Sequence, residues 1–128
     1  QDIDTRAHFG QCLLRRKRPR EALPLLQGVV NENPKHDYGH SLMALAETHM
    51  ALGENDTAIA YWQQVTENHN YAHARVQLAE LLFAKGKKEA ALAEVREVLN
   101  DEPHAPAFQR KRDRVWIRRA KKLMRQLA

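Results

Sequence analysis

The sequence predicts an all-α fold of three consecutive helix–turn–helix units closed by a final helix. Three observations predict it: a segment repeats after 33 residues, apolar residues recur at helical spacing, and glycines separate the predicted helices. No segment shows the sustained alternation of apolar and polar residues that predicts a half-buried strand. A chain of 128 residues has the length of one ordinary domain, so we expect a single domain over residues 1–128.

An internal repeat sets the boundaries of the three units. Residues 36–47 and 69–80 are identical at six of twelve positions, beginning with a His-x-Tyr-x-His segment and ending with Leu-Ala-Glu. Gly53 and Gly86 are also 33 residues apart, and each is followed five residues later by an alanine. Repeats of this period indicate stacked supersecondary units. The pattern predicts units near residues 3–36, 39–71 and 72–105.

Each unit is predicted to contain two helices joined by a tight turn. Each first helix carries a set of mainly apolar residues whose spacing places them on one helical face. The three sets are Phe9, Leu13 and Leu14; Leu42, Leu45, Ala46 and His49; and Ala74, Leu78, Leu81 and Leu82. Gly53 and Gly86 stand where a helix C-terminus requires a positive φ. Pro19 suits the first turn of the second helix in the first unit.

The last segment predicts one amphipathic helix near residues 105–127. Its apolar face would consist of Trp116, Ala120, Leu123, Met124 and Leu127. We expect this face to pack on the second helix of the third unit, near residues 88–101, because terminal repeats need a cap. The opposite face is a candidate basic surface formed by Arg110, Arg114, Arg118, Lys121, Lys122 and Arg125.

The pattern of small and large residues resembles the tetratricopeptide repeat, a unit of 34 residues. The small-residue positions are filled by Gly10, Ala46 and Ala79 in the first helices and by Ala22, Ala58 and Ala91 in the second. The resemblance implies a right-handed superhelical α-solenoid. Phe9 occupies a large-residue position of the family, whereas Asn70 stands where the other two units have proline. The arrangement is similar to bacterial members, some of which carry an N-terminal membrane anchor. It therefore implies a cytoplasmic domain, with a tether outside this chain as one alternative.

The same resemblance implies a non-catalytic function in protein–protein interaction, as an adaptor or scaffold. In the family, the first helices line a concave groove that holds a peptide or protein segment. The corresponding positions here are Gln11, Leu14, His40, Met43, Glu47, Met50, His73, Val76, Gln77, Glu80 and Phe83. Apolar residues and two glutamates would suit a segment with apolar anchors and a basic group. The alternative is that the glutamates pair within the chain, with Arg114 as the expected partner of Glu80.

Residues that could carry catalysis or bind a metal do not form a recognised motif. The sequence contains no glycine-rich phosphate loop, nucleophile elbow or paired-histidine zinc motif, and we predict no enzyme activity and no cofactor. Cys12 lies among apolar neighbours and is read as structural. The histidine pairs at 36/40 and 69/73 straddle predicted turns. We expect Tyr38 and Tyr71 to pack between helices there, rather than a metal site to form.

The charge is distributed unevenly along the chain. The net charge is +5, but residues 21–74 carry seven acidic groups against Lys35, and residues 104–128 carry nine basic groups against Asp113. This asymmetry suggests two surfaces with different partners, or self-association into a homo-oligomer. The basic surface offers a second functional hypothesis, electrostatic binding to an anionic membrane surface or to nucleic acid. Nucleic acid is disfavoured because Trp116 is the only aromatic residue within the basic run.

Overall fold

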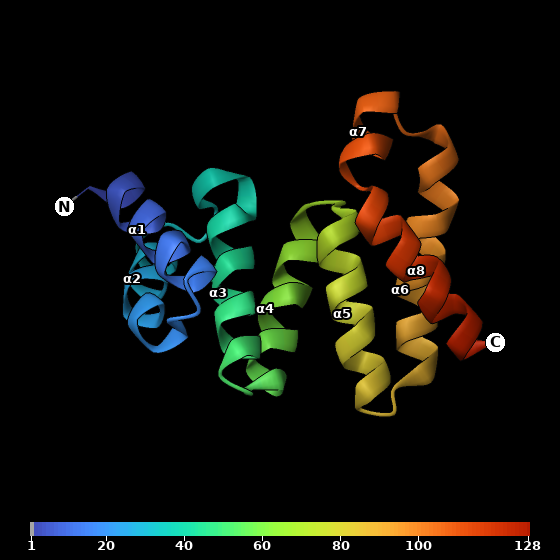
Figure 1. The fold of residues 1–128 in the computed structure, drawn as a ribbon, viewed down its shortest axis with the longest axis horizontal. Coiled ribbons are helices and arrows are strands. Elements are labelled where there is room, and N and C mark those ends of the chain that lie inside the picture. The colour runs from blue at the N-terminus through green and yellow to red at the C-terminus, as the bar shows by residue number, and fades with distance from the viewer. Residues whose placement is uncertain (1) are drawn as a thin grey trace. The chain divides into compact units, whose positions relative to one another are not determined.

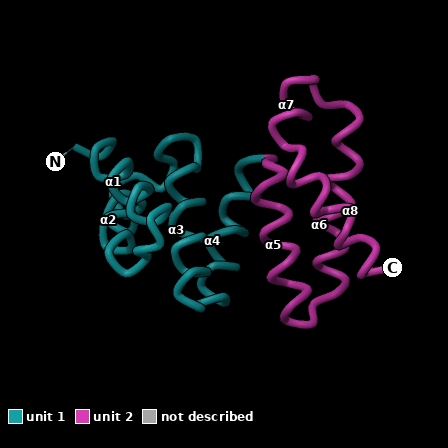
Figure 2. The backbone as a smooth tube through the Cα atoms, in the orientation of Figure 1, with its two compact units in different colours: residues 1–69 teal, residues 70–128 magenta. Residues whose placement is uncertain are grey.

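A computed structural model describes residues 2–128 of the chain (Figure 1). The described residues form α-helices and two short 3₁₀ segments without strands, which confirms the predicted all-α helical-repeat fold. The chain divides into two compact units, residues 1–69 and residues 70–128 (Figure 2). No described helix is both long and apolar enough to cross a membrane.

Unit 1 contains two helical hairpins. The first joins α1 (Ile3–Arg15) to α2 (Pro19–Glu32), and the second joins α3 (His40–Ala51) to α4 (Asn55–Asn68). Helix α3 packs against both α4 and α2, so the two hairpins share a core. Asp2 caps α1, because its side chain accepts a hydrogen bond of 2.7 Å from the Thr5 amide. This bond lowers the pKa of the Asp2 carboxyl below its ordinary value.

The small residues predicted from the repeat pattern are buried between the helices of the hairpins. Ala46, Ala58 and Ala22 are completely buried in unit 1. A Cβ atom added to Gly10 would lie 2.8 Å from Leu26 Cγ, closer than packed atoms allow. The absence of a side chain at Gly10 is therefore a packing requirement of the α1–α2 hairpin.

The two glycines within helices of the first hairpin should respond oppositely to alanine. Gly10→Ala is expected to lower the free energy of unfolding by about 1–2 kcal/mol, because overpacking against Leu26 outweighs the gain in helix propensity. Gly28→Ala meets only the Arg6 guanidinium at 3.6 Å and should stabilise by about 0.5–1 kcal/mol. Chemical denaturation of both variants measures the difference. Equal effects would contradict a close α1–α2 contact.

The connection between the two hairpins of unit 1 has an unusual backbone. A 3₁₀ segment, η1 (His36–Gly39), contains Asp37 and Tyr38 at φ +53° and Gly39 at φ +88°. His36 anchors this segment through contacts of 2.6 Å to Ser41 Oγ and 2.7 Å to Asp4 Oδ1. The prediction that Tyr38 packs between helices is wrong: its side chain is 76% exposed, because the left-handed backbone directs it outward.

Unit 2 contains a third hairpin and the C-terminal cap. The hairpin joins α5 (Ala72–Ala84) to α6 (Lys88–Asp101) and is followed by a 3₁₀ turn, η2 (Glu102–His104). As predicted, Gly53 in unit 1 and Gly86 here have positive φ values, +77° and +79°.

The cap differs from the prediction of one continuous helix at 105–127. It consists of α7 (Ala107–Arg112) and α8 (Arg114–Leu127), which are separated by a turn at Asp113. Helix α8 packs against both α6 and α5, and Ala120, Leu123 and Leu127 are buried there (Figure 1). The apolar face therefore packs as predicted, whereas Phe108 on α7 is 70% exposed. Because of this turn, the axis of α7 is not aligned with the axis of α8 (Figure 1).

Phe9 does not occupy the core position that the repeat pattern assigns to it. Its side chain is 50% exposed. It lines a surface hollow of about 810 Å³ in unit 1, together with Cys12, Leu13, Arg16, Arg18, Glu21 and Leu25. Leu13, one turn further along α1, is buried instead.

Candidate functional site

The first-helix residues of unit 1 fall into two groups. Gln11, Leu14, Glu47 and Met50 are partly exposed and His40 is exposed, so all five offer side-chain surface. Met43, the remaining predicted groove residue of this unit, is only 5% exposed and belongs to the core. Met50 is held by a hydrogen bond of 3.2 Å from Trp62 Nε1 to its sulfur. This bond restricts the Met50 side chain, so its exposed atoms have a defined position on the second hairpin.

The first-helix residues of unit 2 are more deeply covered. Val76 is completely buried and Gln77 is 9% exposed, so neither presents an anchor to a partner. His73, Glu80 and Phe83 remain partly exposed on α5. Two of these three residues contact the cap, which changes what the α5 surface can bind.

A contact network joins Glu80 and His73 to α8. The Arg119 Nε donates a hydrogen bond of 3.0 Å to Glu80 Oε2, and a terminal guanidinium nitrogen pairs with Oε1. The Arg119 guanidinium also lies 4.5 Å from the centre of the Trp116 ring. Trp116 stacks on His73 with 4.0 Å between ring centres and 12° between planes.

The ion pair within this network was expected with a different arginine. Sequence spacing indicated Arg114 as the partner of Glu80, but the structure places Arg119 there. The register differs because the cap begins with a separate α7 and turns at Asp113. The pair matters for recognition more than for stability, since ion pairs near the surface contribute about 0–1 kcal/mol. It neutralises the carboxylate that was expected to select a basic group.

The helices α5 and α8 line a hollow of about 450 Å³ that is open to solvent. We call it the α5–α8 hollow, and its lining comprises Glu80, Phe83, Arg119, Lys122, Leu123 and Gln126. Phe83 provides partly exposed apolar surface, Leu123 lines the hollow although it is only 3% exposed, and Arg119 and Lys122 belong to the same lining. The hollow thus combines two predicted groove residues with four residues of the cap. Sequence reasoning missed the contribution of the cap, although the apolar stripe on α8 was the signal that it would pack here.

The predicted basic surface separates into distinct parts. Arg110, Arg114, Arg118 and Lys121 line one pocket of about 620 Å³ together with Glu102 and Ile117. We call this the basic pocket. Lys122 lines the α5–α8 hollow instead, and Arg125 is exposed in the last turn of α8. The two hollows therefore use different faces of α8.

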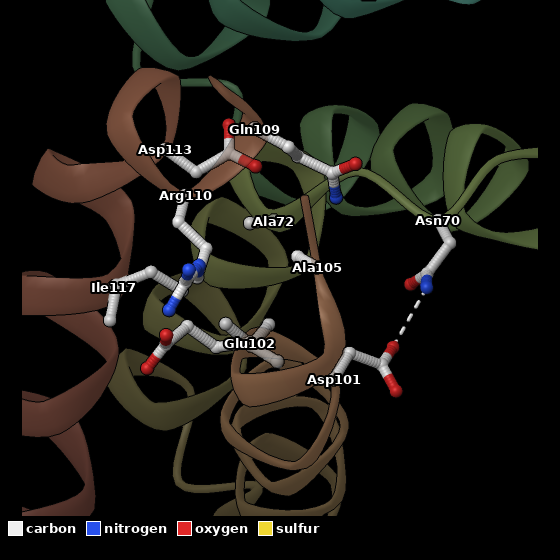
Figure 3. A pocket seen from close by; sticks show the side chains of 10 residues that line it. Asn70, Ala72, Asp101, Glu102, Ala105, Gln109, Arg110, Asp113 and Ile117 are labelled. Carbon is white, nitrogen blue, oxygen red and sulfur yellow. Dashed lines mark hydrogen bonds between the residues drawn. The ribbon is translucent and has the colours of Figure 1, made fainter. Parts of the chain in front are cut away.

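A third, smaller pocket lies where the cap meets the ends of α5 and α6 (Figure 3). Its volume is about 360 Å³, and it shares Glu102, Arg110 and Ile117 with the basic pocket. Asp101 on its rim accepts a hydrogen bond of 2.7 Å from Asn70 Nδ2. Asp113 pairs with Arg112 at 3.2 Å. Two of its three carboxylates thus have side-chain partners of their own, as expected for a structural junction.

The structure also places the residues that were considered for chemistry. Cys12 Sγ lies 3.6 Å from His8 Nε2 and accepts a contact of 3.4 Å from Arg15. Among residues 2–128, no three His, Cys, Asp or Glu side chains are grouped as metal ligands. His36 is engaged by Asp4 and Ser41, as described above.

Comparison with known proteins supports the helical-repeat assignment. The family model described as tetratricopeptide repeat matches residues 13–70 and 49–115. No curated protein sequence gives a significant match. One similar solved structure is a crystal structure of a Podosopora anserina protein described as a kinesin light chain, whose TPR-like repeats are nearly identical to one another. It has a TM-score of 0.67 and 16% sequence identity to this chain. The match covers 98% of this chain and 69% of that one. A variant of that protein matches equally well at 17% identity.

The structural match has too little sequence identity to transfer more than the fold. The family match, in contrast, extends over most of the chain, from residue 13 to residue 115, and includes α2 and the second and third hairpins. Tetratricopeptide repeats generally mediate protein–protein interaction. The three hairpins with buried small residues between their helices, together with this match, establish that the chain belongs to the tetratricopeptide repeat family.

Proposed function

We propose that this chain is a non-catalytic protein-binding module that holds a segment of its partner against the α5–α8 hollow. The observation that carries the proposal is the composition of that hollow, whose lining combines Phe83 and Leu123 with Arg119 and Lys122. Sites that bind side chains are concave and mostly apolar, with a few polar groups that fix orientation. An apolar side chain of the partner would enter the hollow.

The charge of the hollow favours a partner that is not basic. Glu80 is paired with Arg119, and Lys122 adds a positive charge to the same lining. The groove was expected from the sequence to select a basic group through Glu47 and Glu80. In unit 2 the ion pair argues against that selection, because a basic group would meet Lys122. The proposed ligand is therefore an apolar anchor flanked by neutral or acidic residues.

The experiment is selection of peptides from a displayed random library on the purified chain, followed by affinity measurement. Phe83→Ala is expected to weaken the selected peptides about tenfold or more, which corresponds to ~1.4 kcal/mol of binding free energy. Phe108→Ala is the matched control, because Phe108 is an aromatic residue of the same unit, is 70% exposed and does not line the hollow. Circular dichroism checks that both variants remain helical.

The outcomes separate the hollow from other surfaces of the chain. Loss of binding in Phe83→Ala with retention in Phe108→Ala supports the proposal. Equal affinity for both variants, or a loss only in Phe108→Ala, would place the binding surface outside the α5–α8 hollow. A third variant, Lys122→Glu, tests the charge argument, because it should weaken acidic ligands and strengthen basic ones.

A further inference from the structure

The basic pocket gathers four cationic side chains of unit 2 in one concavity. Arg110, Arg114, Arg118 and Lys121 line this single concavity of about 620 Å³, together with Glu102 and Ile117. We propose that the basic pocket is a second binding site, and that its ligand is an acidic polypeptide segment with several Asp or Glu side chains. This site is separate from the α5–α8 hollow, so the two proposals can fail independently.

Helical spacing explains why these cations converge. Arg114, Arg118 and Lys121 follow one another at four and three residues on α8, which places them on one face. The opposite face is packed on the hairpin through Ala120, Leu123 and Leu127. The cationic side chains are consequently held outward in a row. A row of this kind can meet successive carboxylates of one extended or helical segment.

The four cations of the basic pocket are not neutralised by ion pairs within the described part of the chain. Within residues 2–128, Arg110, Arg114, Arg118 and Lys121 form no ion pair, whereas Arg6, Arg75 and Arg119 pair with Glu32, Glu94 and Glu80. Like charges this close on a helix repel one another, and an anionic ligand would relieve the repulsion. The guanidinium groups also match carboxylates, because each can donate two parallel hydrogen bonds.

Two further features favour a polypeptide over a polyphosphate. Glu102 is part of the pocket, and the Arg110 side chain extends toward it (Figure 3). A carboxylate there can accept hydrogen bonds from backbone or side-chain N–H groups of a peptide, and a polyphosphate has no such donors. The lining includes Ile117 but no aromatic residue on which a base could stack.

The geometry of α8 also argues against a lipid surface as the main ligand. Amphipathic helices that bind membranes insert their apolar face, but the apolar face of α8 is covered by α5 and α6. The cations moreover line a concavity rather than a flat patch. An anionic membrane and a nucleic acid are therefore competing outcomes of the test.

The test measures fluorescence anisotropy of a labelled peptide of alternating Glu and Ala, with the matching Gln–Ala peptide as a neutral probe. The Arg114→Glu/Arg118→Glu variant is compared with the wild-type chain. The control is Lys88→Glu/Arg96→Glu, which changes the net charge equally at two exposed residues of α6 outside the pocket. A labelled single-stranded oligonucleotide and phosphatidylserine-containing vesicles are titrated in parallel.

The expected result is binding of the Glu–Ala peptide that falls with rising salt, with no binding of the Gln–Ala peptide. The affinity should drop about tenfold or more in Arg114→Glu/Arg118→Glu and change by less than about twofold in the control. An equal loss in both variants would overturn the proposal, because it would show an effect of net charge alone. Tighter binding of the oligonucleotide or of the vesicles would also overturn it, as would absence of peptide binding at low salt.

Discussion

Replacing Trp62 with alanine is expected to lower the free energy of unfolding of unit 1 by about 3–5 kcal/mol. The Trp62 side chain is completely buried, and its Nε1 donates a hydrogen bond of 3.2 Å to the Met50 sulfur. Alanine would leave a cavity between α3 and α4 and remove that bond. Because domains are stable by only about 5–15 kcal/mol, the variant should lose a large part of its stability.

The measurement is chemical denaturation followed by circular dichroism, with Phe9→Ala as the control. Phe9 is an aromatic residue of the same unit but is 50% exposed, so its loss should cost about 1 kcal/mol or less. A cost at Trp62 no larger than the cost at Phe9 would contradict the packed α3–α4 core. It would also show that the repeat pattern misidentifies the large residue of the second hairpin.

The second large effect is expected at Gly39, in the connection between the hairpins of unit 1. Gly39 has φ +88°, and a Cβ atom there would lie 2.9 Å from the Cδ2 atom of the His69 ring. Gly39→Ala should therefore destabilise by about 2–4 kcal/mol, from left-handed strain plus the collision with His69. The missing side chain at Gly39 thus leaves room for the His69 ring, which allows η1 to pack against the end of α4.

Gly53→Ala separates the two causes of that cost. Gly53 has φ +77°, but an added Cβ atom would meet no described atom within 4 Å. Its replacement should cost only about 1 kcal/mol, from the backbone conformation alone. Thermal and chemical denaturation of the two variants measure the difference. Equal costs would mean that the His69 ring rotates away and that Gly39 is needed only for its backbone.

The two proposed sites of unit 2 assign separate tasks to the faces of α8. The apolar face fixes α8 on the hairpin, one flank completes the α5–α8 hollow through Arg119 and Lys122, and the outward face lines the basic pocket. A partner with an apolar anchor and an acidic segment could use both sites. Combining Phe83→Ala with Arg114→Glu/Arg118→Glu tests this, because effects at independent sites add.

The repeat in the sequence predicted the hairpins because their packing depends on local, periodic features. Alanines at 22, 46 and 58 are completely buried, since a small residue is required wherever two helix backbones approach. Gly53 and Gly86 adopt positive φ, since a helix that ends in a tight turn requires it. These requirements recur in every unit, and recurrence makes them visible in a single sequence.

The candidate site could be predicted only in part. The sequence assigned Glu80 and Phe83 to a binding surface, but Met43 and Val76 proved to be core residues. Which first-helix residues remain exposed depends on the neighbouring helices that cover them. The repeat spacing does not show which α5 residues the cap covers, because the cap stands where a further repeat would otherwise pack.

From the amino-acid sequence alone we could predict the helical class, the three hairpins, the small-residue contacts and the basic charge of the C-terminal helix. Three other features emerged from the docking of the helices: the turn of the cap at Asp113, the pairing of Glu80 with Arg119 rather than Arg114, and the sharing of one pocket by four cations. The difference lies in the range of the interactions. Helix formation and turns depend on residues a few positions apart, whereas the partner of Glu80 lies 39 residues away and is set by how α8 docks on α5.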